Sequence, residues 1–188
     1  MSEEINKFPQ LASSSQFIPY ISKEEINGMV SSLANTISKK YENEDLIVIG
    51  ILKGSTFFLA DLVRQIRNVN LLIDFALFDS VGRTKEEVGT IRIKQDIKSN
   101  VRGKNVLIVQ EILQSGRAAT FLRDRLMISK PRNVEMVTLF NKPYQRVTDF
   151  SPSFIGKEID DHFVIGYGLD LDQYGRNFKE VYYLKYPN

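Results

Sequence analysis

Continuous apolar runs along the chain predict buried strands. Residues 46–52 read Leu-Ile-Val-Ile-Gly-Ile-Leu, which suits a strand covered on both faces of a parallel sheet. Further runs predict strands at residues 71–78, 106–110 and 134–140. Because ligands of parallel α/β sheets bind at the carboxyl ends of the strands, the turns after these runs are where a site is expected.

Helical patterns separate the predicted strands. Ser22 and Glu25 form a capping box, and apolar residues follow at helical spacing as far as Ile37. Further helices are expected at residues 55–66 and from about 118 to 127. Strands that alternate with helices predict an α/β fold with a parallel sheet flanked by helices.

The remaining segments are shorter or more polar. Residues 79–89 contain two glycines and are expected to form a mobile loop. A short strand is expected at residues 90–94. Short β segments are expected at the positions 154–155, 163–166 and 181–184.

Composition limits the classes of chemistry. A length of 188 residues fits one domain, taken as residues 1–188. The chain has no cysteine and a single histidine, His162, which excludes thiol chemistry and HExxH zinc sites. A net charge of +2 is too small to argue for nucleic acid, and no apolar run reaches the roughly 20 residues that span a membrane. We therefore expect a cytoplasmic protein.

Two strand-to-helix turns are the candidate phosphate sites. Ser115 and Gly116 lie where backbone N–H groups at a helix start could hold a phosphate. The alternative is an ordinary strand-to-helix turn whose polar residues bind no ligand. Lys53 and Gly54 form the second turn, which is a weak signal by itself because a loop lysine is usually solvated.

Residues near the C-terminus are open to two interpretations. Asp170 and Asp172 are either solvated acids or hard oxygen ligands suited to Mg²⁺. Phe163 is either a core aromatic or a platform on which a flat base stacks. His162 is interpreted as structural or surface-exposed.

Three collinear segments resemble the hypoxanthine-guanine phosphoribosyltransferases, which have the type I phosphoribosyltransferase fold. Residues 52–62 are similar to the family's pyrophosphate loop, and residues 103–116 are similar to its phosphoribosyl pyrophosphate signature. Residues 154–176 are similar to its purine-binding segment. The resemblance runs from about Ser22 to the C-terminus and implies a small hood subdomain, formed by residues 1–40 and 150–188.

The resemblance implies purine salvage: hypoxanthine or guanine displaces pyrophosphate to give IMP or GMP, with Mg²⁺ as cofactor. Lys142 would donate to the purine 6-oxo group, with Phe163 stacking on the ring and the Val164 backbone reading its edge. Asp170 and Glu111 would bind the metal. The other implied contacts to the sugar phosphates are Lys53, Gly54, Gln110, Ser115, Gly116, Arg117, Ala118 and Arg176.

The sugar-phosphate loop departs from the family pattern. Gln110-Glu111 replaces Glu-Asp, and Gln114 stands at the position of an acidic residue thought to act near the purine N7. Ala118 replaces a threonine, and Val81 replaces a loop tyrosine. An active enzyme has Gln114, Lys142 and Arg176 as catalytic candidates. The rival interpretation is a nucleotide-binding relative that has lost turnover.

The expected partners are small molecules, a 6-oxopurine base and phosphoribosyl pyrophosphate. We expect no nucleic-acid partner and no membrane association. We expect the protein to form a homodimer or homotetramer. An RNA-binding regulator on the same scaffold is a further rival, which a contiguous basic face would favour.

Overall fold

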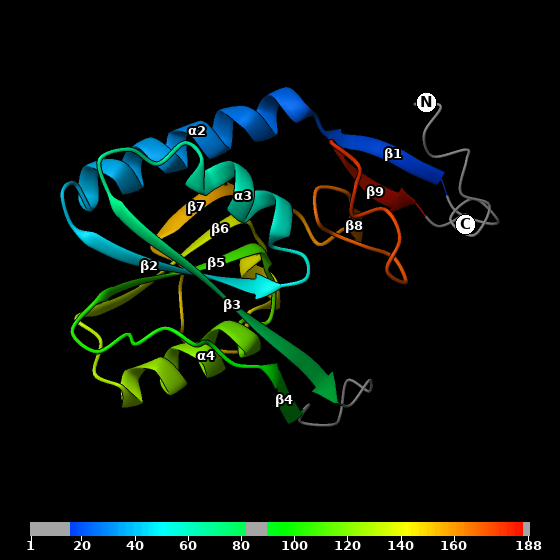
Figure 1. Ribbon diagram of the computed structural model, residues 1–188. Coiled ribbons are helices and arrows are strands. Elements are labelled where there is room, and N and C mark those ends of the chain that lie inside the picture. The colour runs from blue at the N-terminus through cyan, green and yellow to red at the C-terminus, as the bar shows by residue number, and fades with distance from the viewer. Residues whose placement is uncertain (1–15, 82–89, 186–188) are drawn as a thin grey trace.

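The computed structural model describes residues 16–81 and 90–185 and contains a six-stranded sheet at its centre (Figure 1). The strand order is β4-β3-β2-β5-β6-β7, and all neighbours pair in parallel except β3 and β4. The strands are β2 (Asp45–Leu52), β3 (Asn70–Val81), β4 (Thr90–Gln95), β5 (Asn105–Leu113), β6 (Asn133–Asn141) and β7 (Phe154–Glu158). The expected α/β fold with a parallel sheet is confirmed.

Strand β3 is longer than the apolar run that predicted it. It continues through Val81 because its last residues pair antiparallel with β4, from Leu77 to Val81. The first residues of the expected loop, 79–81, are therefore strand. The rest of that loop, residues 82–89, lies outside the described residues, as does the side chain of Val81.

Helices cover both faces of the large sheet. Helices α2 (Lys23–Lys40) and α3 (Thr56–Val63) lie on one face, and α4 (Arg117–Ile128) lies on the other (Figure 1). The expected capping box is present, because Ser22 Oγ accepts from the Glu25 N–H and the Glu25 carboxylate accepts from the Ser22 N–H. Two apolar clusters result, one on each face of the sheet.

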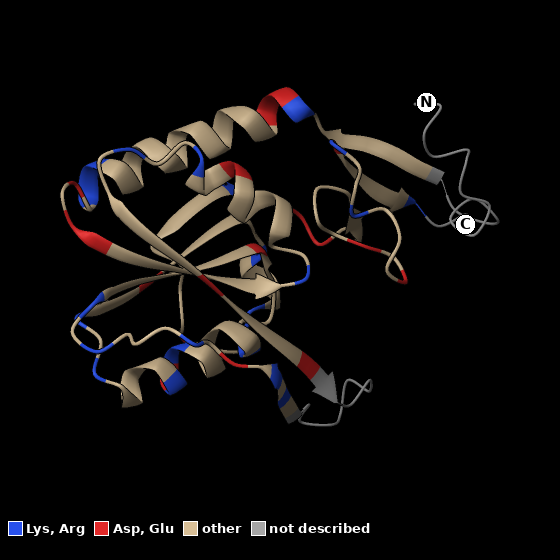
Figure 2. Ribbon diagram, in the orientation of Figure 1, with Lys and Arg blue, Asp and Glu red and all other residues tan. Residues whose placement is uncertain are grey.

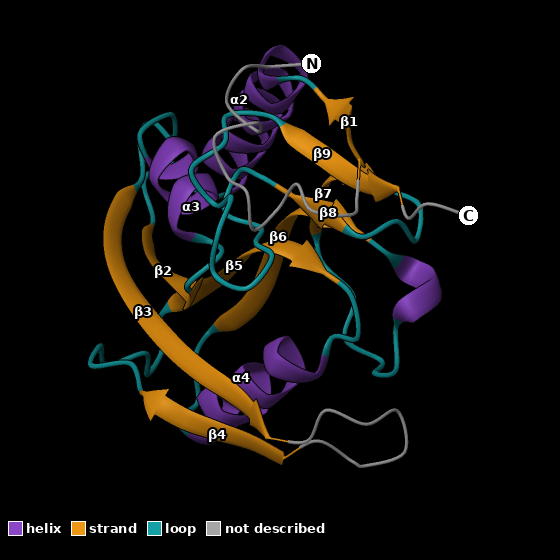
Figure 3. Ribbon diagram, turned by 90° about the vertical axis from the view of Figure 1, so that its right-hand side faces the viewer, coloured by secondary structure: helices purple, strands orange, loops and turns teal. Residues whose placement is uncertain are grey.

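A second, three-stranded sheet stands beside the carboxyl ends of the large sheet (Figure 3). It is antiparallel, in the order β1-β9-β8, and consists of β1 (Gln16–Ile21), β8 (Val164–Ile165) and β9 (Val181–Lys185). Strand β7, which lies within the residues expected to form the hood, pairs with β6 in the large sheet. The apolar side chains of α2 belong to the cluster on one face of that sheet, which also includes Val164 and Val181 of the small sheet.

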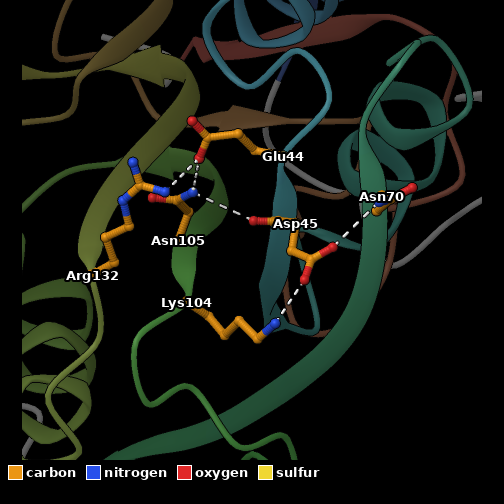
Figure 4. A network of polar contacts seen from close by, with 6 residues as sticks. All are labelled: Glu44, Asp45, Asn70, Lys104, Asn105 and Arg132. Atoms are coloured by element: carbon orange, nitrogen blue, oxygen red, sulfur yellow. Dashed lines mark hydrogen bonds and ion pairs between the residues drawn. The ribbon is translucent and has the colours of Figure 1, made fainter.

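A polar network closes the amino ends of the large sheet (Figure 4). Glu44 accepts from Asn105 at 2.6 Å and from Arg132 at 3.1 Å. Asp45 accepts from Lys104 at 2.6 Å and from Asn70 at 3.3 Å. These bonds join the starts of β2, β3, β5 and β6. The candidate site lies at the opposite side of the sheet, at the carboxyl ends of its strands.

Candidate active site

The turn after β2 packs tightly against two other segments. A Cβ added to Gly54 would overlap the Glu111 carboxylate, and a Cβ added to Gly168, whose φ is +98°, would overlap the Gly54 carbonyl oxygen. Glycine at both positions therefore lets this turn, the Glu111 side chain and the backbone at Gly168 meet at the carboxyl ends of β2 and β5. The peptide bond that enters this turn, between Leu52 and Lys53, is cis.

Charged and polar side chains converge on this turn. Asp170 pairs with Arg176 at 2.7 Å, and Arg176 also donates to the Gly168 carbonyl at 2.7 Å. Lys53 Nζ donates to Gln173 Oε1 at 3.0 Å. The structure thus brings together Lys53, Gly54, Asp170 and Arg176, for which the family resemblance implies contacts to the sugar phosphates and the metal. Gln173 was not expected there.

Glu111 lies beside this group with its carboxyl group buried. Burial raises the pKa of its carboxyl to about 7; nearby Arg176 opposes the rise and nearby Asp170 adds to it. Its Oε2 atom is buried and has no hydrogen-bond partner among the described residues. A buried oxygen left without a donor is costly, and it marks a place where a ligand or ion can contribute the missing contact.

The raised pKa of Glu111 predicts a pH-dependent stability. The folded protein holds the proton more tightly than the unfolded chain, whose glutamate titrates near 4.5. As pH rises from about 4.5 to 7, the free energy of unfolding should therefore fall, by up to about 3 kcal/mol at pH 8. Urea unfolding of the wild type and Glu111→Gln at pH 5 and 8 measures this. The same pH dependence in both proteins would contradict it.

The loop after β5 has the geometry of an anion-binding turn. Gly116 has φ +80° and is the N-cap of α4, where no side chain caps the helix. Among residues 16–81 and 90–185, no acceptor bonds the backbone N–H groups of Ser115, Gly116 and Ala118. Free N–H groups at the start of a helix are suited to a phosphate.

The carbonyl groups of the same loop are all bound. The Leu113 carbonyl accepts from the Lys142 N–H at 2.9 Å, and the Ser115 carbonyl accepts from the Val147 N–H at 3.0 Å. The Gln114 carbonyl accepts from Arg146 Nε at 2.8 Å. Arg146 was missed in the sequence, because it lies in a polar segment after β6 and no local pattern links it to the loop.

Lys142 and Phe163 form a third part of the candidate site, beside the turn after β2 and the loop after β5. Lys142 is only 2% exposed, yet its Nζ donates to the His162 carbonyl at 2.6 Å. Burial lowers the pKa of Lys142, and Asp161 opposes this shift. Phe163 is 41% exposed, so its ring is available to a flat ligand, whereas Val164 is buried in β8. The His162 ring stacks on Tyr183 at 5.0 Å between centroids, which agrees with a structural role.

The other predicted site residues lie along β5 and the start of α4. Gln110 points inward, with a buried Oε1 that has no partner in the described part of the chain. Gln114 and Arg117 are exposed, and Ala118 is half-buried. Asp172, the second acid of its loop, is exposed and has φ +50°.

The donor set suits a metal that brings ligands of its own. Among the described residues, no group of three or more Asp, Glu, His or Cys side chains is placed to hold an ion. Two carboxylates, Glu111 and Asp170, do lie near each other, and one has an unpartnered oxygen. Magnesium is often held by one or two carboxylates together with substrate phosphates, so these residues fit it.

The chain matches a known class of protein. A model of the phosphoribosyl transferase domain matches residues 22–172, which makes the chain a phosphoribosyltransferase. The hypoxanthine-guanine phosphoribosyltransferase of Aquifex aeolicus is 37% identical over 163 residues, covering 86% of this chain and 91% of that protein. At this identity and coverage, the chain belongs to the hypoxanthine-guanine phosphoribosyltransferase family.

Solved structures agree with this assignment. A hypoxanthine phosphoribosyltransferase from Staphylococcus aureus has a TM-score of 0.85 and 35% identity, covering 90% of this chain and 94% of its own. A hypoxanthine-guanine phosphoribosyltransferase from Bacillus anthracis has a TM-score of 0.82 and 35% identity, covering 89% and 98%. No helix in the described ranges is long and apolar enough to cross a membrane.

Proposed function

We propose that this chain performs purine salvage, joining hypoxanthine or guanine to the ribose 5-phosphate of phosphoribosyl pyrophosphate. A purine nitrogen bonds to the anomeric carbon, the bond from that carbon to pyrophosphate breaks, and the nitrogen loses its proton. The observation that carries this proposal is the meeting of a free-amide loop, a cationic turn and a buried lysine at one edge of the sheet.

Each part of that edge fits one part of the substrates. The N–H groups of residues 115–118 bind the 5-phosphate, and Lys53, Gly54 and Arg176 contact the pyrophosphate. Lys142 donates to the 6-oxo group, and Phe163 stacks on the ring. An ammonium group can donate to a carbonyl oxygen but gains nothing from an amino group, so Lys142 favours 6-oxopurines over adenine.

Positioning accounts for most of the proposed catalysis. A centre that develops positive charge at the sugar needs aligned reactants and little covalent help from the protein. Asp170 and Glu111 would hold Mg²⁺ against the pyrophosphate, where the ion would neutralise charge on the leaving group. Arg176 contributes a positive charge on the same side, once substrate oxygens compete for its bond to Asp170.

Gln114 supports a second candidate, a nucleotide-binding relative with weakened turnover. A neutral amide does not accept a proton near pH 7, and Ala118 has no hydroxyl to offer a phosphate. Both changes lie in the loop that would bind the sugar phosphate. Binding and turnover therefore need separate measurements.

Small-molecule substrates, one domain and a cytoplasmic location complete the proposal. Figure 2 shows basic and acidic residues close together on several elements, and Lys104, Arg125 and Arg132 each make an ion pair. This mixture supports small-molecule substrates over a nucleic-acid partner.

We also propose a homodimer or homotetramer, supported by large apolar side chains exposed on α3 and β3, namely Phe57, Leu72 and Ile73.

Nucleotide binding is the first expected result. The retained Lys142, Phe163 and Ser115-Gly116 should bind GMP or IMP with a Kd in the micromolar range, about −8 kcal/mol. Isothermal titration calorimetry measures this, and AMP is the matched control because it lacks the 6-oxo group. A folded protein that binds neither GMP nor IMP would overturn the proposed binding mode.

A further inference from the structure

We infer that Arg146 is a positioning residue for the phosphate loop, acting through the backbone of residues 113–116 rather than by touching the ligand. The inference rests on the proposed function, since the ligand it concerns is the 5-phosphate of a nucleotide or of phosphoribosyl pyrophosphate. Arg146 is not among the residues to which the family resemblance assigned a role.

The side chain of Arg146 makes four hydrogen bonds. Its Nε donates to the Gln114 carbonyl at 2.8 Å, and its Nη2 donates to the Leu113 carbonyl at 3.4 Å. The other two bonds anchor the guanidinium itself: Nη2 donates to Asn141 Oδ1 at 2.6 Å, and Nη1 donates to the Phe150 carbonyl at 3.0 Å. The guanidinium therefore ties the loop to the end of β6 and to residue 150.

These bonds occupy the carbonyl groups of the loop and leave its N–H groups free. Four consecutive carbonyls, those of residues 113–116, are bound within the protein, the last by the Thr120 N–H at 2.9 Å. The N–H groups of Ser115, Gly116 and Ala118 have no acceptor in the described ranges. A phosphate needs N–H groups and is repelled by carbonyl oxygens, so holding the carbonyls away prepares the loop for an anion.

The charge on Arg146 strengthens the effect. Gln114 C=O and Ser115 N–H belong to one peptide group, so a cation at the oxygen polarises the N–H on the other side. Burial lowers the pKa of Arg146, but a guanidinium stays charged at neutral pH. Packing fixes the same arrangement, because a Cβ on Gly116 would lie 2.8 Å from Arg146 Cδ.

Arg146 also lies between the phosphate and base parts of the site. Its anchor Asn141 directly precedes Lys142, whose backbone N–H donates to the Leu113 carbonyl that Arg146 also contacts. The Asn141 amide in turn donates to Glu158 at 3.2 Å. Loss of the guanidinium should therefore weaken binding of the phosphate more than binding of the base.

The test compares GMP with guanosine, which lacks the phosphate. Calorimetry should show that Arg146→Met weakens GMP binding by about tenfold to a hundredfold, the usual cost of losing a group that orients the binding groups of a site without touching the ligand. Guanosine affinity, measured by competition, should change less than threefold. Arg146→Lys should recover part of the GMP affinity, because it keeps the positive charge but lacks the branched set of donors of a guanidinium. Arg132→Met, which removes a guanidinium at the opposite end of the sheet, should change neither ligand (Figure 4).

The outcomes separate this inference from the proposed function. A folded Arg146→Met that binds GMP within threefold of wild type overturns the inference alone. Equal losses for GMP and guanosine also overturn it, since they indicate a general structural role. If Arg146→Met does not fold, the same comparison with Arg146→Lys decides. A folded wild type that binds neither GMP nor phosphoribosyl pyrophosphate overturns both.

Discussion

Replacing Lys142 with alanine should lower kcat/KM for hypoxanthine and guanine by about tenfold to a hundredfold. The reason is the loss of one charged donor to the purine 6-oxo group, which is worth about 1.5–3 kcal/mol. Lys142 is 2% exposed and its Nζ has three N–H bonds to give, of which one goes to the His162 carbonyl. Steady-state kinetics at saturating phosphoribosyl pyrophosphate measure the effect.

Controls separate recognition from folding for this lysine. Lys142→Met keeps most of the side-chain volume, so its thermal unfolding shows whether packing survives the loss of charge. Lys157→Ala removes a lysine that pairs with Glu25 on the surface and should leave the kinetics unchanged. An unchanged kcat/KM for hypoxanthine in Lys142→Ala would remove this residue from the site.

Replacing Gln114 with aspartate should raise kcat about tenfold or more. A carboxylate at this position could accept the proton that leaves the purine, or stabilise positive charge that builds on the ring. General acid–base assistance of this kind contributes about 10²–10⁴-fold, so a tenfold gain is a modest part of it. Gln114 is exposed at the edge of the phosphate loop, so the smaller side chain needs no repacking. The measurement is kcat for both bases at saturating donor and Mg²⁺.

Gln114→Asn is the matched control, because it has the size of aspartate without the charge. Its kcat should stay at or below the wild-type value, and GMP affinity should change little in both variants. A flat or lower kcat in Gln114→Asp would show that positioning and Mg²⁺ supply most of the rate. A wild type that already turns over at ordinary salvage rates would also reject the account of a missing base.

Local sequence patterns were enough to predict the buried strands β2, β5 and β6 of the large sheet. The apolar run that became β2 and the capping box at Ser22 depend on residues close in the chain. Strand β3 exceeded its prediction because Asp79 and Ser80 are polar and become strand only by pairing with Arg92 and Ile91. Pairing between distant segments leaves no periodic signal in either one.

The residues of the candidate site likewise fall into those that a local pattern predicts and those that depend on contacts between distant segments. Ser115-Gly116 and Lys53-Gly54 could be found because each lies in a turn directly after an apolar run. The contact between Gly54 and Gly168 and the bonds of Arg146 to the carbonyls of residues 113 and 114 could not, since each joins segments about 30 or more residues apart. The buried position of Lys142 was equally hidden, because an isolated lysine after a strand resembles a solvated one.

Steady-state formation of nucleotide tests the central claim most directly. The wild type is assayed with phosphoribosyl pyrophosphate, Mg²⁺ and each of hypoxanthine, guanine and xanthine, with adenine as the 6-amino control. The account predicts release of pyrophosphate and formation of IMP or GMP with hypoxanthine or guanine, and far less product with adenine. A folded protein that binds GMP but forms no nucleotide from any of these bases would contradict it.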